Sequence, residues 1–76
     1  MFKIFIRTLD ANEQVTNTAI SGAFAERKEA VAQLDKMVKQ LVKDDEHPDR
    51  NAGYHARQDY WWTRENGVVT HYTIEA

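Results

Sequence analysis

The stretch YWWTRENG, residues 60–67, decides how this chain folds, because it joins a pair of tryptophans to a turn signal. Neighbouring residues of a strand point to opposite faces of the sheet, so Trp61 and Trp62 cannot both enter one core. Asn66-Gly67 is the strongest short signal for a β-hairpin. The length of the hairpin loop therefore determines which tryptophan is buried.

Two loop lengths predict opposite faces for the same strand. A two-residue loop, Asn66-Gly67, mixes charges with core residues on the face that holds Trp61, since that face then contains Arg57, Asp59, Trp61, Tyr72 and Ile74. A three-residue loop, residues 65–67, gives an apolar face made of Tyr54, Ala56, Tyr60, Trp62, Val68, Tyr72 and Ile74. We therefore predict the three-residue loop, with Trp62 in the core and Trp61 outside, opposite His71.

The first part of the chain is predicted to form two strands. Residues 2–8 alternate, with Phe2, Ile4 and Ile6 on the inner face and Lys3, Phe5 and Arg7 on the outer face. A turn at residues 10–13 leads to a second strand at residues 15–20, which is rich in threonine and β-branched residues. The polar centre of that second strand is typical of an edge strand.

A helix is predicted from about Ala25 to Lys43. Apolar residues recur there at spacings of three and four, namely Ala30, Val31, Leu34, Met37, Val38, Leu41 and Val42. The acidic segment 44–53 contains Pro48 and ends this helix. Two β-rich runs follow, at residues 54–64 and 68–75.

The predicted fold is therefore α+β, in the order ββαββ, as one small domain over residues 1–76. A four-stranded, mostly antiparallel sheet is covered on one face by the amphipathic helix. A chain of 76 residues buries only about 60% of the surface that its unfolded form exposes, so association would add stability.

Composition narrows the class of protein. An apolar share of 42% and a charged share of 29% are typical of a folded globular domain. No apolar stretch approaches the roughly 20 residues that span a bilayer, which predicts no membrane contact. The absence of cysteine favours a reducing compartment, and we expect a cytoplasmic protein. The net charge of −2 weighs against binding to a phosphate backbone.

The functional hypothesis rests on the sheet face that the helix leaves open. The predicted binding residues on this face are Trp61, His71, Phe5, Arg57, Arg7 and Lys3. An outward tryptophan near a phenylalanine favours a protein interface, and a homodimer is the commonest such assembly. Binding of single-stranded nucleic acid on the same aromatic and basic face is the alternative. A third interpretation is that Trp61 only lies flat over its own sheet.

Catalytic and metal chemistry have little support in the sequence, so we expect no enzyme, no cofactor and no metal. The three histidines, at positions 47, 55 and 71, lack the spacing of a metal motif. The acidic segment from Asp45 has Arg50 where a calcium loop needs glycine. Ser21, the only serine, lacks a nucleophile motif. Asp59 and His71 are the candidate acid–base pair, but an ion pair on a strand surface is commoner.

Overall fold

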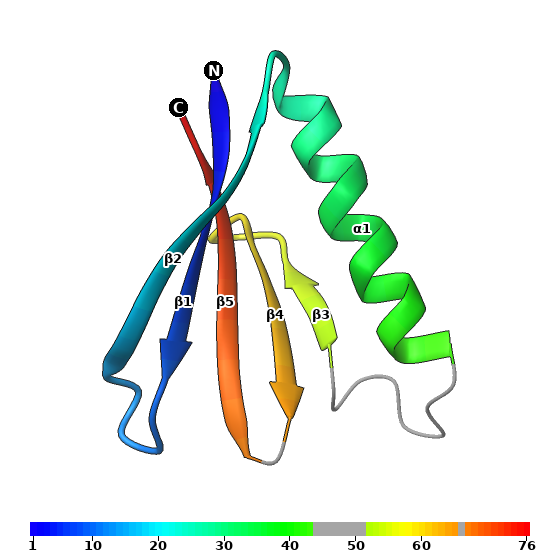
Figure 1. The fold of residues 1–76 in the computed structure, drawn as a ribbon. Coiled ribbons are helices and arrows are strands. Elements are labelled where there is room, and N and C mark those ends of the chain that lie inside the picture. Colours follow the sequence, from blue (N-terminus) through cyan, green and yellow to red (C-terminus); the bar gives the residue numbers. More distant parts are fainter. Residues whose placement is uncertain (44–51, 66) are drawn as a thin grey trace.

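The computed structural model describes residues 1–43, 52–65 and 67–76, and it is an α+β fold of one helix and a five-stranded antiparallel sheet (Figure 1). The elements are β1 (Phe2–Leu9), β2 (Val15–Phe24), α1 (Arg27–Lys43), β3 (Ala52–His55), β4 (Tyr60–Glu65) and β5 (Val68–Glu75). In the sheet they lie in the order β2-β1-β5-β4-β3, and every pairing is antiparallel.

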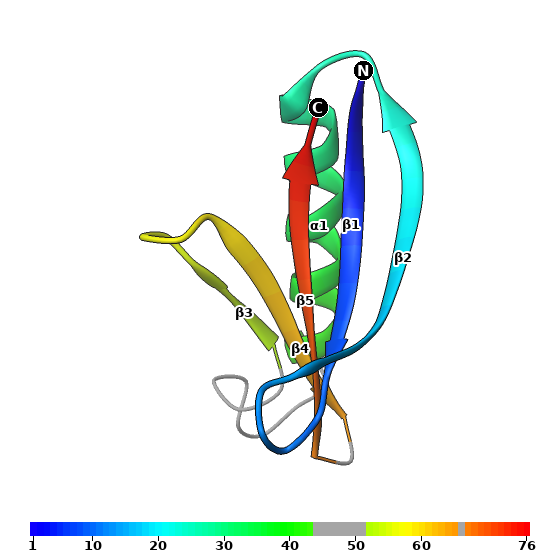
Figure 2. The ribbon, with the colours of Figure 1, turned by 90° about the vertical axis from the view of Figure 1, so that its left-hand side faces the viewer.

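The helix α1 packs on one face of this sheet, while Figure 2 looks onto the opposite face with α1 behind the strands. The buried centre consists of Ile4, Ala30, Leu34 and Trp61, and the partly buried side chains around it are Ile6, Phe24, Val31, Met37, Val38, Tyr72 and Ile74. The predicted apolar stripe of the helix is thus largely the face that packs on the sheet, although Leu41 is exposed. The inward faces predicted for Ile4, Ile6, Tyr72 and Ile74 are confirmed.

The prediction of four strands is wrong, because residues 54–64 do not form one strand. β3 ends at His55, the chain turns at residues 56–59, and β4 begins at Tyr60. Asp59 completes the reversal with a φ of 54°, a left-handed conformation that aspartate adopts more readily than most residues. β3 and β4 then pair as a hairpin, with Gly53 opposite Trp62 and Tyr54 opposite Trp61.

The prediction of a three-residue loop before β5 is also wrong. Glu65 pairs with Val68 and Trp61 pairs with Tyr72, which is the register of a two-residue loop. Trp61 is therefore in the core, 2% exposed, and Trp62 is on the other face, opposite His71. The objection to this register was that Arg57 and Asp59 would share the face of Trp61. That objection disappears because both residues lie in the turn.

The strand β2 lies at one edge of the sheet, as predicted. A β-bulge near its C-terminal end changes which of its residues face the helix. Ser21 pairs with Ile4, but Phe24 pairs with Phe2, so β2 has one extra residue in this interval. Gly22 adopts a φ of 73° there. The extra residue places Phe24 on the helix side, where it packs against the buried cluster.

Candidate functional site

Aromatic and cationic side chains of the strands gather on the sheet face that α1 does not cover, which we call the helix-free face. We use this name for the outward side chains of four of the strands, which are Lys3, Phe5, Arg7 and Leu9 from β1, His55 from β3, Tyr60, Trp62 and Arg64 from β4, and Val69, His71, Thr73 and Glu75 from β5. In the part of the chain that the structure describes, no helix covers this face (Figure 2).

Trp62 lies on the helix-free face between Gly53 of the edge strand β3 and His71 of β5, and its position depends on that glycine. Gly53 is its cross-strand partner, and a Cβ built on Gly53 would lie only 2.9 Å from Nε1 of Trp62. The indole therefore lies over the backbone of β3, in space that any other residue type would fill. The guanidinium of Arg64 lies 5.7 Å from the centre of the Trp62 ring, within the range of a cation–π contact.

A second group of rings runs across three strands of the same face. Tyr60 stacks on His55, with 5.1 Å between the ring centres, and on His71, with 4.4 Å between the ring centres. Burial lowers the pKa of His71, because the charged imidazolium is less well solvated there, although the carboxylate of Glu13 opposes this shift. The neutral form of His71 is therefore favoured in this stack.

Arg7 holds the β1 side of the helix-free face in a fixed arrangement. Its Nη1 donates to Oγ1 of Thr73 at 2.8 Å, and its Nη2 donates to a carboxylate oxygen of Glu75 at 3.0 Å. The hydroxyl of Thr73 donates to the same carboxylate oxygen at 3.0 Å. These hydrogen bonds, first that of Arg7 and then that of Thr73, lower the pKa of Glu75. The guanidinium also lies 5.3 Å from the centre of the Phe5 ring.

One end of the helix-free face is hollowed. A cavity of about 380 Å³ is lined there by Leu9, Tyr60, Val69 and His71 together with Asp10, Glu13 and Gln58. Asp10 shapes the β1–β2 turn, because its carboxylate accepts hydrogen bonds from the backbone N–H groups of Asn12 and Gln14 at 2.9 and 3.0 Å. The face is therefore bounded by acidic groups at this end and carries cations elsewhere.

The predicted binding residues divide into those on the helix-free face and those elsewhere. Lys3, Phe5, Arg7 and His71 have the predicted orientation. The prediction that Trp61 lies on this face is wrong, since Trp61 is buried and its Nε1 donates to the carboxylate of Asp35 on α1 at 2.9 Å. Arg57 lies in the β3–β4 turn and on no strand.

Sequence reasoning missed Tyr60, Trp62 and Arg64 as members of this face. The two-residue loop was the signal that identifies them, because it reverses the orientation of every residue of β4.

Asp59 does not meet His71, so the acid–base pair considered from the sequence does not form. Its carboxylate instead accepts hydrogen bonds from the hydroxyl of Tyr54, at 2.8 Å, and from the guanidinium of Arg27 at the start of α1. The hydrogen bond from Tyr54 and then that from Arg27 lower the pKa of Asp59. The cluster joins the β3–β4 hairpin to the helix, which indicates a structural role.

Metal ligation has no geometric support in the described residues, 1–43, 52–65 and 67–76, where no group of three His, Cys, Asp or Glu side chains is placed to hold an ion. His47 and residues 44–51 of the acidic segment considered for calcium lie outside these residues. Within the same ranges, no helix has the length and apolar character needed to cross a membrane.

Comparison with known proteins gives no relative: no protein-family model matches the chain, and neither a curated protein nor a solved structure matches it.

Proposed function

We propose that this protein is a non-enzymatic interaction module that binds another protein through the helix-free face, in the simplest case a second copy of itself. The observation that carries the proposal is that one uncovered sheet face holds Phe5, Tyr60, Trp62 and His71 as half-buried rings. An uncovered sheet face that holds several aromatic rings is more often a site of interaction than a surface without a function. The lack of cysteine supports a reducing, cytoplasmic setting.

The arrangement of the rings favours a protein partner. Tyr60 already stacks on His55 and on His71, and guanidinium groups lie over the rings of Phe5 and Trp62. Nucleic-acid bases need open ring faces on which to stack, whereas a protein partner needs a fixed, closely packed surface. Side chains that are held before binding also lose less entropy on association.

Binding of single-stranded nucleic acid is the second candidate, and one observation favours it. The sequence predicted Asp59 on the open face of the sheet. In the structure its carboxylate instead accepts hydrogen bonds from Arg27 and Tyr54 on the helix side. The helix-free face therefore carries the cations Lys3, Arg7 and Arg64, and Glu75 is the acidic residue that its strands contribute. Salt-dependent quenching of tryptophan fluorescence by a single-stranded oligonucleotide would support this candidate over a protein interface.

Sedimentation equilibrium over a wide concentration range tests the self-association. We expect the weight-average mass to rise from 8.8 kDa toward twice that value in the wild type, and to stay at 8.8 kDa in Trp62→Lys. Leu41→Lys is the matched control, because Leu41 is an exposed apolar side chain on α1, away from this face, and its variant should associate like the wild type. A wild-type protein that stays monomeric up to about 1 mM contradicts self-association.

A further inference from the structure

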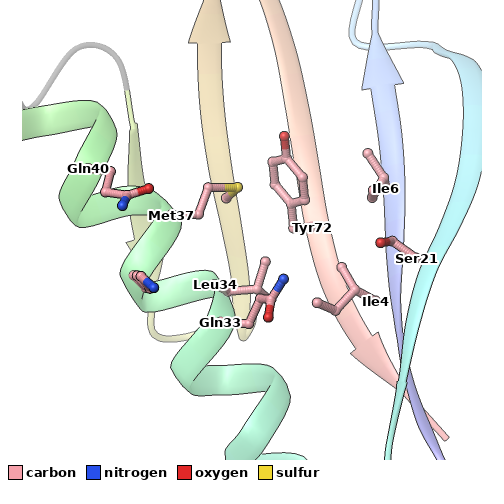
Figure 3. A pocket seen from close by; sticks show the side chains of 9 residues that line it. Ile4, Ile6, Ser21, Gln33, Leu34, Met37, Gln40 and Tyr72 are labelled. Carbon is pink, nitrogen blue, oxygen red and sulfur yellow. The ribbon is translucent and has the colours of Figure 1, made fainter.

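A cleft lies between α1 and the sheet, beside the buried cluster (Figure 3). We call it the helix-side cleft, and its volume is about 360 Å³. Its floor is aliphatic apart from one ring, because the residues that line it from β1, α1 and β5 are Ile4, Ile6, Leu34, Met37 and Tyr72. An apolar cleft of about 300–1,000 Å³ with a few polar groups at its rim is the usual form of a small-molecule site.

The helix-side cleft exists because α1 does not extend over β2. Ala19 and Ser21 pair with Ile6 and Ile4, whose side chains face the core, yet both β2 residues are exposed. Ile6 and Met37 are only partly buried as a result. These apolar side chains keep some contact with water, so an apolar ligand that covers them gains affinity from their burial.

One rim of the helix-side cleft is a polar row on α1. Gln33, Lys36 and Gln40 line the cleft there, at spacings of three and four residues that place them on one side of the helix. Ser21 lines the opposite rim, from β2. Lys36 is the only charged side chain among the described residues of the lining, so the rim is cationic.

No acid near Lys36 competes for its charge among the described residues. Its ammonium group takes part in none of the ion pairs between them. Its neighbours on the helix surface, three and four positions away, include no acid, being Ala32, Gln33, Lys39 and Gln40. The adjacent Asp35 accepts a hydrogen bond from Trp61. An anionic group at this rim therefore meets a cation and amide donors.

We propose that the helix-side cleft binds a free carboxylic acid with an unbranched alkyl chain, the chain on the aliphatic floor and the carboxylate against Lys36. The flexible side chain of Met37 can adapt to such a chain. An extended protein segment fits less well, because its backbone N–H and C=O groups would lie over Ile4, Ile6 and Leu34, which offer them no hydrogen bond. An alkyl chain carries no such groups, and its one polar end meets the polar rim. The cleft lies on the opposite side of the sheet from the helix-free face, so this proposal does not rest on the function proposed for that face.

Titrations followed by ¹H–¹⁵N NMR test the contribution of the chain. The probes are sodium hexanoate, octanoate and decanoate, each two methylene groups longer than the one before. The amide signals that shift should include those of Ile4, Ile6, Leu34 and Met37. We expect the dissociation constant to fall at least about fourfold at each step, which corresponds to about half of the full burial of each methylene group. A dissociation constant that does not change with chain length would contradict binding on the apolar floor.

Lys36→Gln tests the contribution of the carboxylate, with 1-octanol as the uncharged counterpart of octanoate. The substitution should weaken octanoate binding at least about threefold, in the range of an exposed ion pair, and should change octanol binding less than about 1.5-fold. Lys39→Gln is the matched control, because it removes the same charge one turn away and outside the lining. Its affinity for octanoate should be that of the wild type.

Two neighbouring substitutions on β2 locate the ligand. Ser21→Trp places a ring in the cleft and should weaken octanoate binding at least about fivefold, whereas Ile20→Trp, on the opposite face of the same strand, should change it less than about twofold. Trp62→Lys should bind octanoate like the wild type, which keeps this site separate from the helix-free face. The proposal is overturned if the amides of the cleft do not shift up to about 20 mM octanoate, or if Lys36→Gln and Lys39→Gln have equal effects.

Discussion

Trp61 and Trp62 are adjacent in the sequence but have opposite structural roles. Trp61 is 2% exposed, contacts the ring of Tyr54 with 4.6 Å between ring centres, and donates to Asp35 on α1. Trp62 is half-buried on the helix-free face, where it lies over Gly53 and under the guanidinium of Arg64. The same residue type thus stabilises the fold in one position and forms part of a surface in the next. The comparison shows that register, more than residue type, assigns each role.

Replacing each tryptophan by alanine tests this division most strongly. Trp61→Ala removes a buried ring and should lower the free energy of unfolding by about 3–5 kcal/mol, a large part of the stability of a small domain. Trp62→Ala should cost about 1–2 kcal/mol, because its ring is already partly in contact with water and an exposed cation–π contact adds only about 0.5–1 kcal/mol. Urea unfolding measures both values.

Trp61→Phe is the control for that experiment, since it keeps a ring under α1 but loses the hydrogen bond to Asp35. If packing dominates the contribution of Trp61, the free energy of unfolding lost in Trp61→Phe should be smaller than in Trp61→Ala and larger than in Trp62→Ala. Equal losses for Trp61→Ala and Trp62→Ala would contradict the assigned register.

Gly53→Ala tests the surroundings of Trp62 alone. The added methyl would lie 2.9–3.0 Å from atoms of the indole, so the ring must move or the β3–β4 pairing must loosen. We expect a loss of about 1–3 kcal/mol in the wild type, the usual cost of overfilling a packed site. In a Trp62→Ala background the same substitution should be nearly neutral, and the coupling between the two changes is measured as a double-mutant cycle. Additive effects would show that the indole does not lie over Gly53.

Much of the fold could be predicted because several segments allow only one interpretation. The alternation of β1 and the period of α1 each assign a single apolar face, and this fixed the orientations of Lys3, Phe5 and Arg7. Tyr72 and Ile74 face the core in either register considered, which left His71 on the open side. These members of the candidate site were therefore predictable from the sequence.

The rest could not be predicted, because the β3–β4 turn has no sequence signal of the usual kind. Residues 56–59, Ala-Arg-Gln-Asp, contain neither glycine nor proline, and the reversal depends on Asp59 in a left-handed conformation with its carboxylate bonded to Tyr54 and Arg27. Without that turn, Arg57 and Asp59 counted as strand residues and made the correct register look unfavourable. One concealed turn thus reversed the assignment of both tryptophans.

The smallest expected effect is the pH dependence of stability, and it distinguishes the two sides of the sheet. The pKa of His71, on the helix-free face, is lowered by burial from its ordinary value of 6.5, so the unfolded chain binds a proton more readily than the folded one. Stability from this group is complete above pH 6.5 and declines as the pH falls below that value. Asp59, on the helix side, has a pKa below its ordinary 3.8, so its contribution is lost only as the pH falls through that lower value.

Thermal unfolding between pH 8 and pH 3 of the wild type, His71→Gln and Asp59→Asn separates these contributions. His71→Gln should reduce the loss of stability just below pH 6.5. It should leave unchanged the loss of stability at acidic pH where carboxylates titrate, to which Glu75 also contributes through its lowered pKa. Asp59→Asn should reduce that loss at acidic pH and leave the region near pH 6.5 unchanged. If His71→Gln instead retained the full decline near pH 6.5, burial of His71 between Tyr60 and its neighbours would not be the cause. That result would contradict the stacking of His71 on Tyr60 in the helix-free face.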